Sequence, residues 1–275
     1  MAANNGLRYK DKVTIVTGGS KGIGLGVVQV FVKNGAKVVF CARSVDEAEG
    51  KEVEADMNKL GIGEALFIPC DVSKEEEIKN LIEKTVAKYG RIDCLVNNAG
   101  YHPPHMPIDD FSSDDFRELL NVNLVSYFIA AKYALPYLRK VEGNIINMSS
   151  LVGQIGQFGA VTYVATKGGI SAMTRALSID EAKYNVRVNS VSPGNVWTPM
   201  WESGAKHTPN PEKTIENGAN SQLSGRYGTL EESGTSCLFL AADATFCTGI
   251  DLNLSGGAEL NYGIKTMRGE KELPF

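Results

Sequence analysis

A tyrosine and a lysine four positions apart are the first residues in this sequence whose types and spacing could move a proton. Tyr163 and Lys167 enclose the run Tyr-Val-Ala-Thr-Lys, and side chains at i and i+4 of a helix lie on the same face. A free phenol has a pKa of about 10, which makes it a poor acid or base near neutrality. A neighbouring ammonium stabilises the phenolate and brings its pKa towards a usable value. Taken alone, however, this spacing is more typical of an amphipathic surface pair.

Three other features give the pair a chemical setting. Ser150 follows the apolar run 144–148, where its hydroxyl could hold a substrate oxygen, and Asn123 lies on the long helical pattern before that run. The segment Pro-Gly-Asn-Val-Trp-Thr follows another strand-like run, and its backbone at Val196 and the Thr198 hydroxyl could fix a carboxamide. Together with Tyr163 and Lys167, these residues indicate a catalytic constellation.

A glycine-rich turn follows the first strand-like run of the chain. Its glycines allow a tight turn and let backbone N–H groups approach a pyrophosphate at the positive end of the next helix. We predict that this turn binds a dinucleotide through Gly18, Ser20, Lys21, Gly22, Ile23 and Gly24. The alternative is a purely structural turn between a strand and a helix.

The end of the second strand discriminates between the two nicotinamide dinucleotides. A carboxylate there would accept hydrogen bonds from an unmodified ribose and repel a 2′-phosphate. This chain has Ala42-Arg43 instead, which supplies no acid and adds a guanidinium able to fork onto phosphate oxygens. Lys21 adds a second positive charge. The pattern favours NADP(H), with NAD(H) as the alternative if Arg43 is only a solvated surface residue.

Two further strand ends complete the predicted nucleotide site. Asp71 and Val72 follow the third strand, where a carboxylate suits the adenine amino group. Asn97 and Ala99 follow the fourth, where small residues let the strand end lie beside the ribose. Tyr163 and Lys167 would contact the same cofactor.

Short apolar runs alternate with longer amphipathic stretches along the chain. Strands are expected at 12–17, 37–41, 65–70, 92–97, 144–148, 187–191 and 249–254, and helices at 22–34, 45–60, 73–89, 114–139, 161–183 and 229–241. The third helix is expected to open on a capping box at Ser73 and Glu76. This alternation implies right-handed crossovers. We therefore predict an α/β fold, a Rossmann-type doubly wound parallel sheet of about seven strands with helices on both faces.

The 275 residues suit one dinucleotide-binding and catalytic domain, since no linker or repeat divides them. The Pro- and polar-rich segment 198–224 is predicted to be a loop inserted over the substrate site, and 265–275 a polar tail. The formal net charge of −4 argues against a nucleic-acid partner, and no run of 18 apolar residues predicts a membrane span. Five cysteines without a CxxC pair indicate a reducing, cytoplasmic location.

A metal site is not expected. His102 and His105 form an H-x-x-H pair, but a zinc site needs three or four ligands and the chain has only one other histidine, His207.

Taken together, these motifs resemble the short-chain dehydrogenase/reductase family over residues 12–257. The resemblance implies a catalytic tetrad without a metal. Tyr163 would be the general acid/base, Lys167 would bind the nicotinamide ribose and lower the phenol pKa, Ser150 would position the substrate, and Asn123 would hold a water of a proton relay. A hydride would pass between the nicotinamide and a carbinol carbon.

Within that family, segments 97–104, 150–153, 193–201 and 256–260 are most similar to the 17β-hydroxysteroid dehydrogenases. This likeness implies a homotetramer and a substrate pocket touched by His102, Gln157 and Trp201. Those relatives have an aspartate where Ala42 stands, so their NAD linkage is not carried over.

The first functional expectation is therefore an NAD(P)-dependent oxidoreductase that interconverts a secondary alcohol and a ketone, with 17β-hydroxysteroids as substrates. One alternative is a dehydrogenase of a small sugar, such as a 6-deoxyhexose, at a hydroxyl or lactol, because His102, Gln157 and Thr162 would make the pocket partly polar. A second alternative is a non-catalytic nucleotide-binding subunit.

Overall fold

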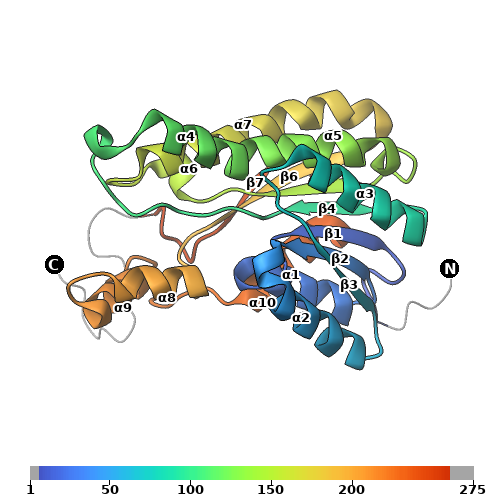
Figure 1. Ribbon diagram of the computed structural model, residues 1–275, viewed down its shortest axis with the longest axis horizontal. Helices are drawn as coiled ribbons and strands as arrows, with labels where there is room; N and C mark the ends of the chain where they lie inside the picture. Colours follow the sequence, from blue (N-terminus) through green and yellow to red (C-terminus); the bar gives the residue numbers. More distant parts are fainter. Residues whose placement is uncertain (1–5, 261–275) are drawn as a thin grey trace.

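A parallel β-sheet forms the middle layer of the computed structural model, which describes residues 6–260 (Figure 1). Its strands within these residues are β1 (Val13–Thr17), β2 (Lys37–Ala42), β3 (Glu64–Pro69), β4 (Cys94–Asn97), β5 (Asn144–Met148), β6 (Arg187–Pro193) and β7 (Asp251–Leu254). They lie in the order β3-β2-β1-β4-β5-β6-β7, and every neighbouring pair is parallel. The order changes direction between β1 and β4, and ligands of such sheets bind beyond the carboxyl ends of the strands at this point. The predicted fold class is confirmed.

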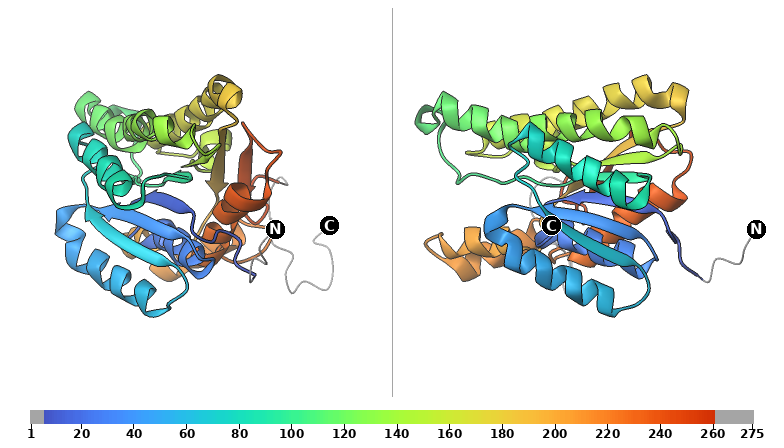
Figure 2. Two further views of the ribbon diagram at one scale, coloured as in Figure 1. Left: turned by 90° about the vertical axis from the view of Figure 1, so that its right-hand side faces the viewer. Right: turned by 45° about the vertical axis from the view of Figure 1, so that its right-hand side comes forward.

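Helices cover both faces of the sheet (Figures 1 and 2). One layer contains α1 (Gly22–Lys33), α2 (Glu47–Lys59) and α10 (Leu230–Leu238). The other contains α3 (Glu75–Tyr89), α4 (Ser113–Leu120), α5 (Ser126–Leu138), α6 (Val152–Ile155) and α7 (Val161–Glu181). Because side chains of a strand alternate between its faces, Val38 and Phe40 of β2 enter one hydrophobic core, while Val39 and Cys41 enter the other. Strands buried on both faces explain the continuous apolar runs of the sequence.

The expected helix 114–139 is one helical run with a wider turn in its middle. Between α4 and α5, residues Asn121–Val125 form a π-helical stretch. Such stretches occur often at functional sites, and this one carries the buried Asn123.

The expected capping box at Ser73 and Glu76 is wrong. The α3 helix begins at Glu75, and no side chain caps its first turn. The Ser73 hydroxyl donates instead to Asp71 Oδ1 at 2.7 Å, and Glu77 Oε2 accepts from the Asp71 backbone N–H at 2.7 Å. The Asp71 carboxylate thus engages the hydroxyl that the capping box would have used.

The segment 198–224 is not a loop, because it contains α8 (Pro199–Lys206) and α9 (Pro211–Asn220). Both helices begin alike: Thr198 and Asn210 accept a hydrogen bond from the third backbone N–H that follows, and a proline occupies the first helical position. These are ordinary helix-start signals. The two helices lie at one end of the molecule, below α4 and α6 in Figure 1.

Among residues 6–260, no helix combines the length and the apolar character needed to cross a lipid bilayer. The predicted tail 265–275 lies outside the described residues.

Two glycines let α1 and α10 pack backbone against backbone. A Cβ on Gly26 would lie 2.1 Å from the carbonyl oxygen of Leu230, and a Cβ on Gly234 would lie 2.3 Å from that of Gly26. Neither contact can be relieved by turning a side chain. This packing fixes the start of α1, and therefore the glycine-rich turn, against the sheet.

We expect Gly26→Ala to lower the free energy of unfolding by about 1–3 kcal/mol, because the added methyl forces the two helices apart. Gly204→Ala is the matched control, since a Cβ there meets nothing within 4 Å and alanine favours a helix. The control should raise stability slightly. Urea unfolding of both variants measures the difference, and equal effects would contradict the backbone packing.

Candidate active site

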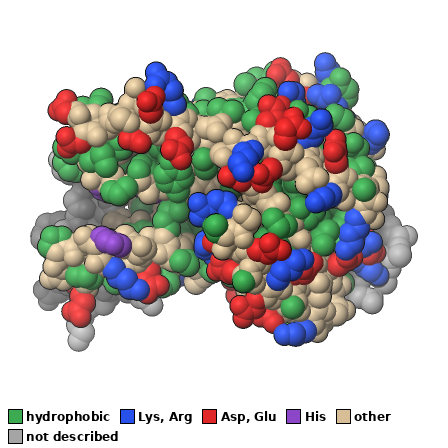
Figure 3. Space-filling view, viewed as in Figure 1, with side chains coloured by type: hydrophobic (Ala, Val, Ile, Leu, Met, Phe, Trp, Pro, Cys, Tyr) green, Lys and Arg blue, Asp and Glu red, His purple; other side chains and the backbone are tan. Residues whose placement is uncertain are grey.

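A cavity of about 1020 Å³ opens at the carboxyl ends of the strands, where the two helical layers separate. Figure 3 shows the molecule hollowed at this end, between the layer of α4 and that of α8 and α9. The predicted site residues that line it are Gly18, Ser20, Lys21, Gly22, Ile23, Arg43, Asp71, Val72, Ala99, His102, Ser150, Gln157, Tyr163, Lys167, Val196, Thr198 and Trp201. Gly24, Asn97 and Asn123 do not line it.

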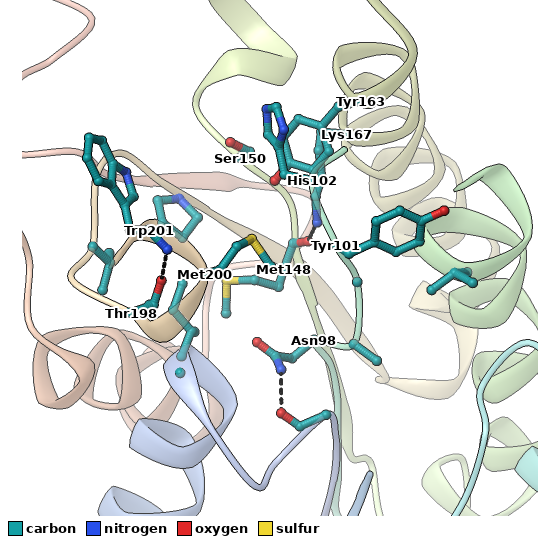
Figure 4. A pocket seen from close by; sticks show the side chains of 18 of the residues that line it. Asn98, Tyr101, His102, Met148, Ser150, Tyr163, Lys167, Thr198, Met200 and Trp201 are labelled. Atoms are coloured by element: carbon teal, nitrogen blue, oxygen red, sulfur yellow. Dashed lines mark hydrogen bonds between the residues drawn. The ribbon is translucent and has the colours of Figure 1, made fainter. Parts of the chain in front are cut away.

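The α7 helix places Tyr163 and Lys167 on the face that packs against β5 (Figure 4). Lys167 is only 4% exposed, and its Nζ donates to the carbonyl oxygen of Met148, the last residue of β5, at 2.8 Å. The same Nζ lies 5.7 Å from the centre of the Tyr163 ring. Burial lowers the pKa of the Lys167 amine from 10.5 to about 7. The pair is therefore not the surface pair that its spacing alone would favour.

Burial also dominates the acidity of Tyr163. Desolvation raises the pKa of its phenol to about 12, and a hydrogen bond with Ser150 acts in the opposite direction. In the protein without cofactor, desolvation of the phenol therefore outweighs any stabilisation of the phenolate by Lys167, whose amine is itself desolvated. The expected lowering of the phenol pKa by Lys167 and the oxidised nicotinamide together stays a prediction. Ser150 lies beside the phenol, as expected (Figure 4).

Asn123 lies behind the cavity wall and is fully buried. Its Oδ1 accepts from the backbone N–H of Tyr101 at 3.0 Å, and its Nδ2 donates to the Tyr101 carbonyl oxygen at 2.9 Å. The Nδ2 also lies 3.3 Å from Thr166 Oγ1. Its amide therefore fixes the backbone at Tyr101, and the expected role of Asn123 in a proton relay stays a prediction.

Gly24 and Asn97 also act from behind the cavity. A Cβ on Gly24 would lie 2.1 Å from the Gly18 carbonyl oxygen, so the residue is small because the turn is tight. Asn97 Nδ2 donates to Asn147 Oδ1 at 2.9 Å between β4 and β5, which are neighbours. Both residues support the site without contacting its contents.

The nucleotide end of the cavity fits a dinucleotide phosphate. The α1 helix begins at Gly22 with no side-chain cap, so its first N–H groups stay available to an anion. Asn98, which the sequence analysis missed, donates through Nδ2 to Thr17 O at 2.9 Å and Gly18 O at 3.0 Å. It thereby ties the glycine turn to the end of β4. Its position directly after a buried strand was the available signal.

The predicted phosphate-binding cations have a partner that the sequence analysis missed. Lys21 Nζ lies 2.9 Å from Asp46 Oδ1, and Arg43 Nε lies 3.6 Å from Asp46 Oδ2. Asp46 lines the cavity as well. The two cations therefore share one carboxylate.

The three predicted substrate contacts lie on two sides of the cavity (Figure 4). The His102 ring lies 4.1 Å from the Tyr163 ring, centre to centre, and its Nε2 lies 3.0 Å from Gln157 Oε1. Trp201 faces them from α8, where its indole Nε1 donates to Asn195 Oδ1 at 3.2 Å. The wall beside the phenol is therefore polar.

The Thr198 side chain has two roles. It lines the cavity and also accepts a hydrogen bond from the Trp201 backbone N–H at 3.2 Å, which caps α8.

No group of three or more His, Cys, Asp or Glu side chains within the described part of the chain could hold a metal ion.

Comparison with known proteins agrees with this geometry. The family model described as enoyl-(acyl carrier protein) reductase matches residues 18–259. The chain belongs to the short-chain dehydrogenase/reductase family. It is an oxidoreductase that acts on CH–OH groups, and the fold implies that it binds a nicotinamide dinucleotide.

Individual relatives cover almost the whole chain. The chain is 52% identical over 260 residues to an L-fucose dehydrogenase of Bos taurus, covering 94% of each protein. It is 53% identical over 258 residues to an L-fucose dehydrogenase of Rattus norvegicus, covering 94% of this chain and 93% of that one. The solved structure of Thermoplasma acidophilum aldohexose dehydrogenase has a TM-score of 0.84 and 30% identity, covering 94% of this chain and 98% of that one. The expected likeness to 17β-hydroxysteroid dehydrogenase type 14 is not confirmed by these relatives.

The buried amine has a measurable consequence for stability. Because the pKa of Lys167 is lowered in the folded protein, the unfolded chain binds more protons between about pH 7 and pH 10.5, and stability rises with pH across that window. Lys167→Met removes this cost. The variant should be more stable than the wild type at pH 6, and its advantage should shrink as the pH rises towards 10.

Urea unfolding at several pH values tests this expectation, with the exposed Lys84→Met on α3 as the control. A pH-independent difference between Lys167→Met and the wild type would show that Lys167 is not desolvated as described.

Proposed function

We propose that the protein is an NAD(P)-dependent dehydrogenase of a small sugar, which oxidises the lactol hydroxyl of a 6-deoxyhexose to the lactone. The observation that carries the proposal is the hydrogen-bonded His102–Gln157 pair beside the Tyr163 ring, in a chain 52% identical to an L-fucose dehydrogenase. Hydroxyl groups of a sugar can use the hydrogen-bonding positions that this pair leaves open, whereas the apolar rings of a steroid would cover those positions without satisfying them, at a cost.

The protein groups suggest how the reaction proceeds. Tyr163, in the phenolate form that a bound oxidised nicotinamide would favour, accepts the proton of the substrate hydroxyl as the carbon–hydrogen bond breaks. Ser150, which lies beside the phenol and lowers its pKa, orients the same substrate oxygen. A nicotinamide dinucleotide, when bound, supplies the hydride acceptor. Its oxidised ring carries a positive charge, which would lower the pKa of the desolvated phenol more strongly than it would in water.

For the cofactor, we propose NADP(H), with NAD(H) as the alternative. The support is the absence of an acid at Ala42 and the presence of Lys21 and Arg43 on the cavity wall. The homotetramer and the cytoplasmic location implied by the family resemblance stay predictions.

A panel of substrates with both nicotinamides tests the proposed function. We expect kcat/KM to be higher for L-fucose than for a 17β-hydroxysteroid.

A substitution of the phenol tests the acid/base role. Tyr163→Phe should lower kcat by about 10²–10⁴-fold, because the proton then has no acceptor. Tyr101→Phe, at another tyrosine that lines the cavity, is the control and should keep its activity.

The panel can contradict the proposal in two separate ways. A preference for the steroid would overturn the substrate class and leave the dehydrogenase assignment intact. Turnover by Tyr163→Phe near the wild-type rate would overturn the acid/base role.

A further inference from the structure

Asp46 lies between Lys21 and Arg43, the two cations that are predicted to bind a 2′-phosphate of the cofactor. The short 3-10 turn Ser44–Asp46 follows Arg43, and the backbone N–H of Asp46 donates to the Arg43 carbonyl oxygen at 2.9 Å. This turn brings the carboxylate back between the Lys21 ammonium, at 2.9 Å, and the Arg43 guanidinium, at 3.6 Å. All three residues line the cavity.

The carboxylate is the best-fixed member of this group. The side chain of Asp46 is 17% exposed, against 49% for Lys21 and 67% for Arg43. The hydrogen bond from Lys21 holds the pKa of the Asp46 carboxyl below its usual range, so the group stays ionised at neutral pH. A phosphate that approaches Lys21 and Arg43 therefore meets a fixed negative charge.

A second carboxylate lies beside Lys21. Glu49 Oε2 is 3.5 Å from Lys21 Nζ, and the Ser20 hydroxyl lies 3.5 Å from the same oxygen. Two cations and two carboxylates carry no net formal charge, so the group offers a phosphate dianion little net attraction. An uncharged ribose hydroxyl, in contrast, would find an acceptor in Asp46.

We propose that Asp46 is the residue that limits the selectivity of this site for a 2′-phosphorylated ribose. Its carboxylate competes with the phosphate for Lys21 and Arg43, so the preference of the site for NADP(H) over NAD(H) is smaller than the two cations alone would give. Neutralising Asp46 frees both cations and strengthens the selectivity for the phosphorylated form. This inference rests on the dinucleotide site of the proposed function and is independent of the sugar substrate.

The test measures binding of two nucleotide fragments by calorimetry. The probe 2′,5′-ADP carries the 2′-phosphate, and 5′-AMP lacks it. We expect Asp46→Asn to bind 2′,5′-ADP about 5- to 10-fold more tightly than the wild type, because a like charge next to the phosphate is removed. Affinity for 5′-AMP should stay within about twofold. The gain should diminish as salt is added, since the cations are partly exposed.

Three further variants make the result specific. Asp56→Asn changes a carboxylate on α2, the helix that follows the turn of Asp46. Asp56 pairs with Lys59 and not with the cavity cations, so this variant should change neither affinity. In the Arg43→Ala background the gain from Asp46→Asn should shrink, because one of the released cations is then missing. Glu49→Gln should give a smaller gain than Asp46→Asn, since Glu49 contacts only Lys21 of the two cations.

The outcomes separate the inference from the proposed function. Unchanged binding of 2′,5′-ADP by Asp46→Asn, or an equal gain for both fragments, would overturn the inference and leave the dehydrogenase intact. An undiminished gain in the Arg43→Ala background would overturn it as well. If neither fragment bound any variant, the nucleotide site would be absent and the proposed function would fail with it.

Discussion

The structure depends on the burial of one amine beside one phenol at the carboxyl end of β5. Lys167 is held there by the Met148 carbonyl oxygen at 2.8 Å, and the next helical turn on the same face of α7 carries Tyr163. Desolvation pushes both groups towards their neutral forms, with a pKa of about 7 for the amine and about 12 for the phenol. Two desolvated groups respond strongly to any charge that enters the cavity. The site is thus prepared for a charged ligand before one binds.

Residues elsewhere in the fold hold the catalytic part of the cavity in a fixed position relative to its nucleotide-binding part. Asn98 joins the glycine turn to β4, and Asn123 fixes the backbone at Tyr101 from behind the wall. The close contact between Gly26 and Leu230 fixes how closely α1 packs against α10. None of these residues needs to touch a substrate, and each joins two elements that border the cavity. Polar residues buried in this way act through the groups that they position.

The sequence was sufficient for the sheet and for most of the cavity wall. Alternating apolar runs predict parallel strands buried on both faces, and parallel strands end at one edge, so motifs at strand ends such as Asp71 and Ser150 are expected to converge. The order of the motifs along the chain therefore predicts the cavity even without knowledge of side-chain contacts.

The errors arose where a local pattern had more than one possible partner. The Ser73 hydroxyl could have capped the N-terminus of α3 or bound the Asp71 carboxylate, and in the structure it donates a hydrogen bond to the carboxylate. The pairing of Arg43 with Asp46 depends on a turn that spacing alone does not fix. The sign of the pKa shift of Tyr163 depends on burial, which the sequence does not show.

A titration of the Tyr163 phenol tests directly whether desolvation raises its pKa in the folded protein. Tyrosine labelled with ¹³C at the ring carbon that bears the hydroxyl reports ionisation by NMR, and the Tyr163→Phe spectrum identifies the signal. The phenol should stay protonated up to about pH 12 in the protein alone, and its pKa should fall markedly when an oxidised nicotinamide dinucleotide is added. An ordinary pKa near 10 that does not respond to the dinucleotide would contradict this prediction.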